Sequence, residues 1–169
     1  MNKPYTGRTY IVTGAGNGLG FEYAKLLAAK GAHVVINDLG GAPDGSGASS
    51  SAAEHAASAL IDAGGTASAN TADVTDEGQV RDLVEQAVAV TGRLDGLICN
   101  AGILRDKMLF NMAPEDWDIV QNVHPRGHFL PLHFAAANGE SSPKCKVLPS
   151  TPQSCSPLPA PACTPAPAS

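Results

Sequence analysis

The sequence predicts an α/β fold in which helices cover both faces of one parallel sheet. Two observations predict it. Short runs of β-branched and apolar residues alternate with longer segments that have helical apolar spacing, and the connections between them are short. An order of β-α-β-α-β-α-β favours parallel strands joined by right-handed crossovers. The expected strand order is 3-2-1-4, which is the first half of a doubly wound sheet.

The first elements follow each other closely. Residues 9–12 are a β-branched and aromatic run typical of a strand. Residues 18–30 carry an apolar helical stripe, which Gly31 is expected to end. A second strand is predicted at residues 33–37, followed by a glycine- and serine-rich loop at residues 39–49.

The alternation then continues. The alanine-rich residues 51–63 predict a second helix, and residues 66–71 a weak third strand. Residues 75–90 predict a third helix, with Thr75 as its N-cap and acidic residues in its first turn. The apolar residues 94–99 predict a fourth strand.

Two further helices are predicted before the composition changes. They span residues 114–123 and 127–137, with Pro125 ending the first and tolerated in the first turn of the second. Residues 138–169 hold most of the 13 prolines, no aromatic residue and few large aliphatic ones. Such a segment cannot bury enough apolar surface to fold, so we expect a disordered, low-complexity tail after a folded unit at residues 1–137. The abrupt change also raises the hypothesis that this tail is an out-of-frame translation.

Composition excludes several classes of function. The net charge is −5 and no basic cluster occurs, which argues against nucleic acid or an anionic membrane as a partner. No apolar run is long enough to span a membrane and no apolar leader follows Met1, so the expected location is cytoplasmic. The four cysteines have no zinc-ligand spacing, so no metal site is predicted, and Cys99 is expected to be buried.

A glycine-rich turn joins the first strand to the first helix. Backbone N–H groups in such a turn approach a pyrophosphate, whose charge is stabilised by the helix N-terminus. The residues predicted to hold a dinucleotide here are Thr13, Gly14, Asn17, Gly18, Leu19 and Gly20.

An acidic residue follows at the end of the second strand. Asp38 lies 18 residues beyond Gly20, near the spacing expected for an acid that binds the adenosine ribose of a Rossmann-type fold. An acid there repels a 2′-phosphate, and no Lys or Arg follows in the loop. NAD is therefore predicted, and NADP is less favoured.

Two more short motifs follow strands three and four. Asp73 and Val74 come after the third, and Asn100, Ala101 and Gly102 after the fourth. Ligands bind beyond the carboxyl ends of strands in such sheets, so both motifs are expected to border the cofactor. Taken alone, each is also a common turn sequence.

Together these residues resemble the short-chain dehydrogenase/reductase family over residues 7–137. The glycine turn matches the family pattern TGxxxGxG, and Asp38, Asp73-Val74 and Asn100-Ala101-Gly102 match its other cofactor motifs. The resemblance implies an oxidoreductase that acts on a CH–OH group and binds a dinucleotide, and it leaves a homo-oligomer open. The stretches NDLGG at 37–41 and NAGILRD at 100–106 resemble one branch, the (3R)-hydroxyacyl-CoA dehydrogenases of peroxisomal multifunctional enzymes and bacterial relatives. That branch implies an acyl-CoA substrate.

The family's Tyr-x-x-x-Lys pair has no counterpart in the sequence. Its Tyr acts as general acid/base, and here only Tyr5, Tyr10 and Tyr23 occur, none followed four residues later by Lys. Catalysis by this chain is therefore expected to be impaired. His124 occupies the position of the family's catalytic Asn, so the resemblance makes it a candidate for ordering a water or kinking the helix. The alternative is a histidine bonded to local backbone.

Several further expectations remain open. Trp117 is expected in the core, and His128 and His133 on a helix surface or in packing. Two other functions are weighed: a non-catalytic NAD-binding or regulatory module, and a methyltransferase, which has a similar sheet and glycine turn. The TGxxxGxG spacing and the Asn-Ala-Gly motif disfavour the methyltransferase.

Overall fold

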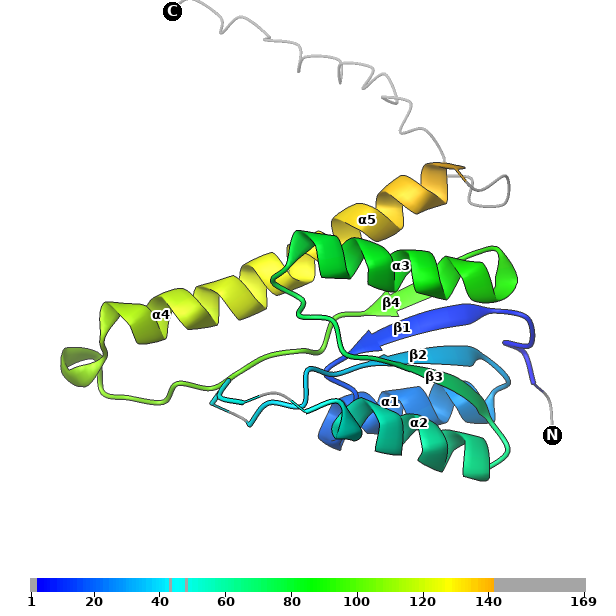
Figure 1. Ribbon diagram of the computed structural model, residues 1–169, viewed down its shortest axis with the longest axis horizontal. Helices are drawn as coiled ribbons and strands as arrows, with labels where there is room; N and C mark the ends of the chain where they lie inside the picture. Colours follow the sequence, from blue (N-terminus) through cyan, green and yellow to red (C-terminus); the bar gives the residue numbers. More distant parts are fainter. Residues whose placement is uncertain (1–2, 43, 48, 142–169) are drawn as a thin grey trace, which may run out of the picture.

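The computed structural model describes residues 3–42, 44–47 and 49–141. Strands and helices alternate along this part of the chain (Figure 1). The elements are β1 (Thr9–Thr13), α1 (Gly18–Ala29), β2 (His33–Asn37), α2 (Ser51–Asp62), β3 (Thr66–Asn70), α3 (Glu77–Thr91), β4 (Gly96–Ile98), the 3₁₀ turn η1 (Leu109–Asn111), α4 (Pro114–Gln121), the π-helical turn η2 (Asn122–Arg126) and α5 (Gly127–Ser141).

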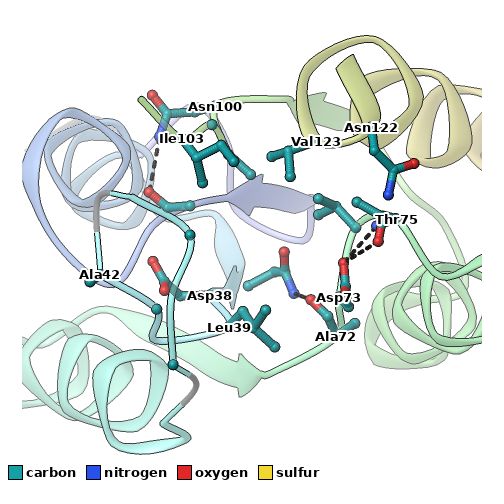
Figure 2. A pocket seen from close by; sticks show the side chains of 18 of the residues that line it. Asp38, Leu39, Ala42, Ala72, Asp73, Thr75, Asn100, Ile103, Asn122 and Val123 are labelled. Carbon is teal, nitrogen blue, oxygen red and sulfur yellow. Dashed lines mark hydrogen bonds between the residues drawn. The ribbon is translucent and has the colours of Figure 1, made fainter. Parts of the chain in front are cut away.

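The four strands form one parallel sheet in the order β3-β2-β1-β4, which confirms the predicted order. Val12 of β1 is level with Ile36 of β2 on one side and with Ile98 of β4 on the other. Because all four strands run the same way, their carboxyl ends meet at one edge of the sheet. The loops that follow those ends surround a cavity (Figure 2).

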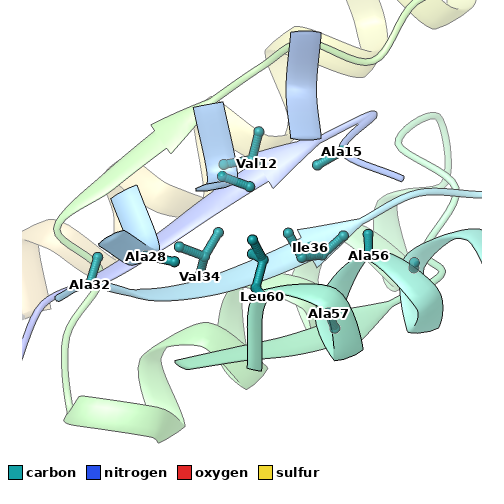
Figure 3. Packing of buried hydrophobic residues seen from close by; sticks show 11 residues of the cluster. Val12, Ala15, Ala28, Ala32, Val34, Ile36, Ala56, Ala57 and Leu60 are labelled. Carbon is teal, nitrogen blue, oxygen red and sulfur yellow. The ribbon is translucent and has the colours of Figure 1, made fainter. Parts of the chain in front are cut away.

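One face of the sheet is covered by α1 and α2 (Figures 1 and 3). Val12, Val34 and Ile36 point to this face and pack against the helices. The helix side chains that meet them are mostly small: Ala24, Ala28, Ala53, Ala56, Ala57 and Leu60. Small side chains let both helices lie close to the sheet, and the buried apolar area stabilises the fold.

The other face is covered by α3 and, beside it over β4, by α5. Ile11 and Val35 point to this face, because neighbouring residues of a strand point to opposite sides. They pack against Leu83, Val84 and Ala87 of α3. The sheet therefore carries helices on both faces, as predicted for a doubly wound fold.

The N-cap predicted for α3 is wrong by one residue. Asp76, not Thr75, is the cap, and its side chain accepts a 2.9 Å hydrogen bond from the N–H of Gln79. The hydroxyl of Thr75 instead donates to Asp73 Oδ1 at 2.8 Å. The Thr75 hydroxyl is therefore bonded to Asp73 in the turn before the helix and does not cap the N–H groups of α3.

The break predicted at Pro125 is also wrong. The chain passes from α4 to α5 through the π-helical turn η2, which contains Pro125. A proline lacks the N–H that an α-helix requires at that position, and one wider turn accommodates this without ending the helix. The predicted helices at 114–123 and 127–137 therefore form one continuous helical segment.

Three smaller expectations differ from the structure. Trp117 is 57 % exposed, because α4 extends beyond the sheet instead of packing on it (Figure 1). Cys99 is only half-buried, like the residues of β4 before it, because β4 is an edge strand of the described sheet. Helix α5 continues past residue 137 to Ser141, and the side chain of Asn138 bonds back to the carbonyl of Phe134. Residues 142–169 of the predicted tail lie outside the described residues.

Candidate functional site

A cavity of about 640 Å³ lies at the carboxyl edge of the sheet (Figure 2). Residues from the ends of all four strands and from η2 line it. Ten of the twelve residues predicted to bind a dinucleotide are among them: Gly14, Asn17, Gly18, Leu19, Asp38, Asp73, Val74, Asn100, Ala101 and Gly102. Thr13 and Gly20 do not line the cavity, and they shape the turn from beneath.

Close approach of backbone segments explains two glycines of the turn. Gly14 has a φ of +62°, and a Cβ there would stand 2.8 Å from the Cα of Ala101. A Cβ on Gly20 would overlap the carbonyl oxygen of Gly14. Any side chain at either position would therefore push apart the turn, the start of α1 and the segment after β4.

The N-terminus of α1 faces this cavity with its backbone groups uncapped by a side chain. Asn17 is the N-cap in an extended conformation, and its side chain makes no capping hydrogen bond. No acidic residue occupies the first turn. The helix therefore presents N–H donors and the positive end of its dipole, an arrangement that suits a phosphate.

Asp38 ties two glycine-rich segments together. Its Oδ2 accepts a 2.7 Å hydrogen bond from the N–H of Gly16, and its Oδ1 accepts one of 2.7 Å from the N–H of Gly40. Each carboxylate oxygen retains a further lone pair. The side chain is thus fixed by backbone donors and can still accept hydrogen bonds from the hydroxyls of a ribose.

The segment after β4 is joined to β1 through Thr13. The Thr13 hydroxyl accepts hydrogen bonds from the N–H groups of Asn100 (3.0 Å) and Ala101 (3.1 Å). The side chain of Asn100 donates to the carbonyl of Gly14 at 2.9 Å. The side chain of Asn100 therefore stabilises the conformation of the glycine turn.

Asp73 and Val74, which follow β3 and are predicted to border the cofactor, have different environments. The Asp73 carboxylate accepts from both the N–H and the hydroxyl of Thr75, each at 2.8 Å. Val74 is buried, and a Cβ on Gly127 would stand 2.8 Å from its Cγ2. Val74 thus packs against the start of α5 and gives the cavity an apolar wall at this end.

His124 lies in η2 and contacts the backbone after β4. Its Nε2 is 2.9 Å from the carbonyl oxygen of Ile103 and 3.2 Å from the N–H nitrogen of the same residue. One ring nitrogen serves one of these partners at a time, and the shorter contact has Nε2–H donating to the carbonyl. A Cβ on Gly102 would be 2.6 Å from the ring, so Gly102 makes room for it. The geometry supports the alternative of a backbone-bonded histidine.

His128 makes a similar contact with the backbone after β4, which the sequence pattern did not predict. Its Nε2 lies 3.2 Å from the carbonyl oxygen of Ala101. It stands four residues after His124, one helical turn along, and that spacing is the signal that could have identified it. The two imidazoles thus brace consecutive parts of the segment after β4.

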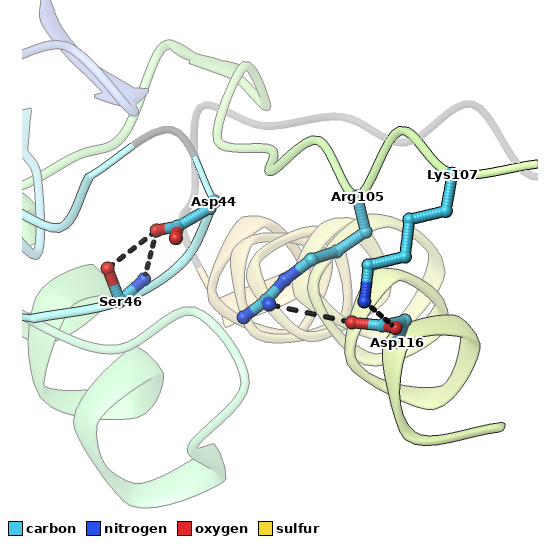
Figure 4. Close-up of polar contacts among 5 residues, drawn as sticks. All are labelled: Asp44, Ser46, Arg105, Lys107 and Asp116. Atoms are coloured by element: carbon cyan, nitrogen blue, oxygen red, sulfur yellow. Dashed lines mark hydrogen bonds and ion pairs between the residues drawn. The ribbon is translucent and has the colours of Figure 1, made fainter. Parts of the chain in front are cut away.

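A smaller cavity of about 300 Å³ adjoins this segment on the side of α4. At its wall Asp116 forms ion pairs with Lys107 at 2.5 Å and with Arg105 at 3.5 Å (Figure 4). Hydrogen bonding to Lys107 lowers the pKa of Asp116 below its usual range, against the opposing effect of burial. The pair fixes the segment at 103–107 to α4.

The family follows from a comparison with known sequences. The family described as short chain dehydrogenase matches residues 8–138. The chain belongs to this family, whose members are oxidoreductases that bind a nicotinamide dinucleotide. This family match excludes the alternative hypothesis that the chain is a methyltransferase.

Individual relatives agree with this assignment. Peroxisomal multifunctional enzyme type 2 of Drosophila melanogaster is 48% identical over 125 residues, which are 74% of this chain and 20% of that protein. Hydroxyacyl-CoA dehydrogenase ChsB1 of Mycobacterium tuberculosis is 44% identical over 132 residues, 78% of this chain and 40% of that protein. The crystal structure of a short chain dehydrogenase from Mycobacterium avium has a TM-score of 0.74 at 44% identity, over 83% of this chain and 48% of that chain. The chain spans less than half the length of each.

Proposed function

We propose that this chain binds NAD through residues 1–137 and contributes that cofactor to an oxidoreductase reaction on a 3-hydroxyacyl-CoA. One observation carries the cofactor assignment. The Asp38 carboxylate and the glycine turn are joined by the bond from Gly16, so one rigid unit offers a ribose acceptor beside a phosphate-binding helix terminus. The cavity volume suits part of a dinucleotide.

The preference for NAD over NADP rests on charge. Asp38 lines the cavity, and a 2′-phosphate would have to lie against its carboxylate. No Lys or Arg is among the described residues that line the cavity, so no cation there would compensate the second negative charge.

The substrate class rests on the relatives. One is named a hydroxyacyl-CoA dehydrogenase and another a peroxisomal multifunctional enzyme, and both exceed 40% identity. Bound NAD would supply the hydride acceptor for oxidation of the alcohol carbon, and a protein group would have to remove the hydroxyl proton. The 169 residues contain no Tyr-x-x-x-Lys pair to do so, and none of the three tyrosines lines the described cavity. We therefore propose that the chain as it stands binds the cofactor with little turnover of its own.

Calorimetric titration of the purified chain with NAD and NADP tests the binding, and NADH formation with a panel of 3-hydroxyacyl-CoA thioesters tests the turnover. Saturable binding of NAD, weaker binding of NADP and little NADH are expected. Absence of NAD binding contradicts the cofactor assignment, and rapid NADH formation contradicts the impaired catalysis.

The alternative of a regulatory module predicts the same NAD binding, so the turnover assay separates the two: slow but measurable NADH formation with a 3-hydroxyacyl-CoA favours the oxidoreductase, and none with any thioester favours the module. Within the described residues no helix is long and apolar enough to cross a membrane. A cytoplasmic location stays a prediction, because several relatives carry the word peroxisomal in their names.

A further inference from the structure

A network of side-chain amides lies under the cavity, between the sheet and α3. Asn37 ends β2, Asn70 ends β3 and Gln86 belongs to α3. Asn37 and Asn70 are register partners on the face covered by α3. The side chain of Asn37 donates to Asn70 Oδ1 at 3.1 Å, and the side chain of Asn70 donates to Gln86 Oε1 at 2.7 Å. None of these side chains has a role in the cofactor motifs described above.

The network reaches the backbone at two residues: the Gln86 side chain donates to the carbonyl of Ala69 at 3.3 Å, and both backbone groups of Ala72 are bonded. The Ala72 N–H donates to Asn70 Oδ1 at 2.8 Å, and its carbonyl accepts from the side chain of Asn37 at 2.9 Å. Ala72 lies past the end of β3, so no strand ladder pairs these two groups. Two side chains take the place of a neighbouring strand and fix both the position and the direction of the chain here.

The residues that follow, Asp73 and Val74, are among those predicted to border the cofactor. Ala72, Asp73 and Val74 all line the cavity. The other end of the network reaches the phosphate and ribose contacts, since the carbonyl of Asn37 accepts a 3.1 Å hydrogen bond from the N–H of Ala15 in the glycine turn. Asn37 also directly precedes Asp38.

Asn37 is 1 % exposed, so its amide has few partners outside this network. A buried amide with satisfied donors and acceptors is rigid, and a truncated partner leaves polar groups unpaired. The network therefore has the properties needed to set the distance between Asp38 and the Asp73–Val74 segment.

We propose that Asn37, Asn70 and Gln86 are positioning residues that hold the adenosine-binding segment at the end of β3 in register with Asp38. This inference rests on the proposed dinucleotide binding. It differs from a purely structural role, in which the network would only add stability between β2 and β3.

The strand pair offers a matched control for this difference. Ser68 lies on the same face of β3, and its hydroxyl is 3.1 Å from His33 Nε2 on β2. Ser68→Ala thus removes a side-chain bond between the same two strands, away from the cavity. Asn70→Leu removes the acceptor of Ala72, and Asn70→Asp retains it.

The probe is ADP-ribose, which contains the adenosine and both phosphates but no nicotinamide, titrated calorimetrically into the full chain and each variant. Asn70→Leu is expected to raise the Kd about tenfold, the loss typical of one to two buried hydrogen bonds. Asn70→Asp should stay within about threefold of the parent chain, and Ser68→Ala should leave the Kd unchanged.

Hydrogen exchange at the Ala72 N–H gives a second readout that needs no ligand. Protection of this amide should be lost in Asn70→Leu and kept in Ser68→Ala. If Asn70→Leu does not fold, Gln86→Ala decides, with an expected rise in Kd of about threefold and faster exchange at Ala72.

The outcomes separate the two proposals. If the parent chain does not bind ADP-ribose, the proposed function fails and the inference falls with it. If the parent chain binds and Asn70→Leu binds equally well, or if Ser68→Ala weakens binding as much as Asn70→Leu, the inference alone is wrong.

Discussion

The Asp38 carboxylate and the backbone N–H of Gly16 are joined by a hydrogen bond of 2.7 Å. This bond connects the acid at the end of β2 to the glycine turn at the end of β1. A Cβ on Gly16 would stand 2.8 Å from the carboxylate, so a glycine is required for the contact. Ribose and phosphate recognition are therefore coupled in the same few residues.

Asp38→Asn is expected to weaken NAD binding about tenfold, because a neutral amide accepts from one of the two glycine N–H groups and loses the charge-assisted bonds. NADP should lose less affinity than NAD, since the repulsion of its 2′-phosphate is removed. Calorimetric Kd values for both dinucleotides measure the ratio. Asp62→Asn, an exposed carboxylate at the end of α2, is the control, and an unchanged ratio in Asp38→Asn would contradict the assigned role.

Gly20→Ala is expected to destabilise the fold by about 1–3 kcal/mol and to abolish dinucleotide binding, because the added Cβ meets the carbonyl of Gly14. Gly78→Ala is the matched change in another helix, where the nearest atom to the new Cβ is 3.4 Å away. It should leave stability unchanged or raise it by up to about 1 kcal/mol. Urea unfolding compares the two, and equal stabilities would show that the turn tolerates a side chain.

Gly102→Ala should displace the imidazole of His124, whose Cε1 would lie 2.6 Å from the new Cβ. A cost of about 1–3 kcal/mol is expected in the free energy of unfolding. The same change made together with His124→Ala should cost less, because the obstructing ring is gone. A double-mutant cycle by urea unfolding measures this coupling. Strictly additive effects would mean that the two residues do not meet.

The pattern of the sequence was sufficient for the sheet order and for placing the cofactor motifs around one cavity. Each of those motifs follows a strand, and the carboxyl ends of parallel strands necessarily share an edge. Thr13 and Gly20 behave differently from their neighbours because they hold the turn from below. That distinction depends on which atoms of Gly14 and Asn100 approach them, and spacing alone does not contain it.

The helical segment after β4 was harder to predict. Proline usually breaks an α-helix, but here Pro125 lies in the π-helical turn η2 and Pro131 inside α5, and the helical segment continues through both. Trp117 was expected inside because it is large and apolar, but its burial depends on what α4 packs against. Within the described residues α4 projects past the sheet, so hydrophobicity alone gave the wrong answer.

Asp116 should make stability depend on pH in the acid range. Its pKa is lowered in the folded chain, chiefly by the hydrogen bond from Lys107. Its contribution is therefore present above the carboxyl's unfolded pKa and is lost as the pH falls through the lower folded value. Asp116→Asn should lower the urea midpoint at pH 7, and the gap to the parent chain should close as the pH falls below the ordinary carboxyl range and through the lowered folded pKa. Asp118→Asn, an exposed carboxylate on the same helix, is the control, and a gap that persists in acid would contradict the ion pairs.

Cys99 should react slowly with alkylating reagents in the folded chain. Burial raises the pKa of its thiol, so less of the reactive thiolate is present near pH 8. The thiol also lies 3.9 Å from the carbonyl oxygen of His128, which restricts approach to the sulfur. Iodoacetamide labelling followed by mass spectrometry of the peptide that contains Cys99 gives the rate. The same peptide labelled in concentrated urea is the reference, because unfolding removes both effects. Equal rates with and without urea would show that the segment after β4 does not shield this thiol in solution.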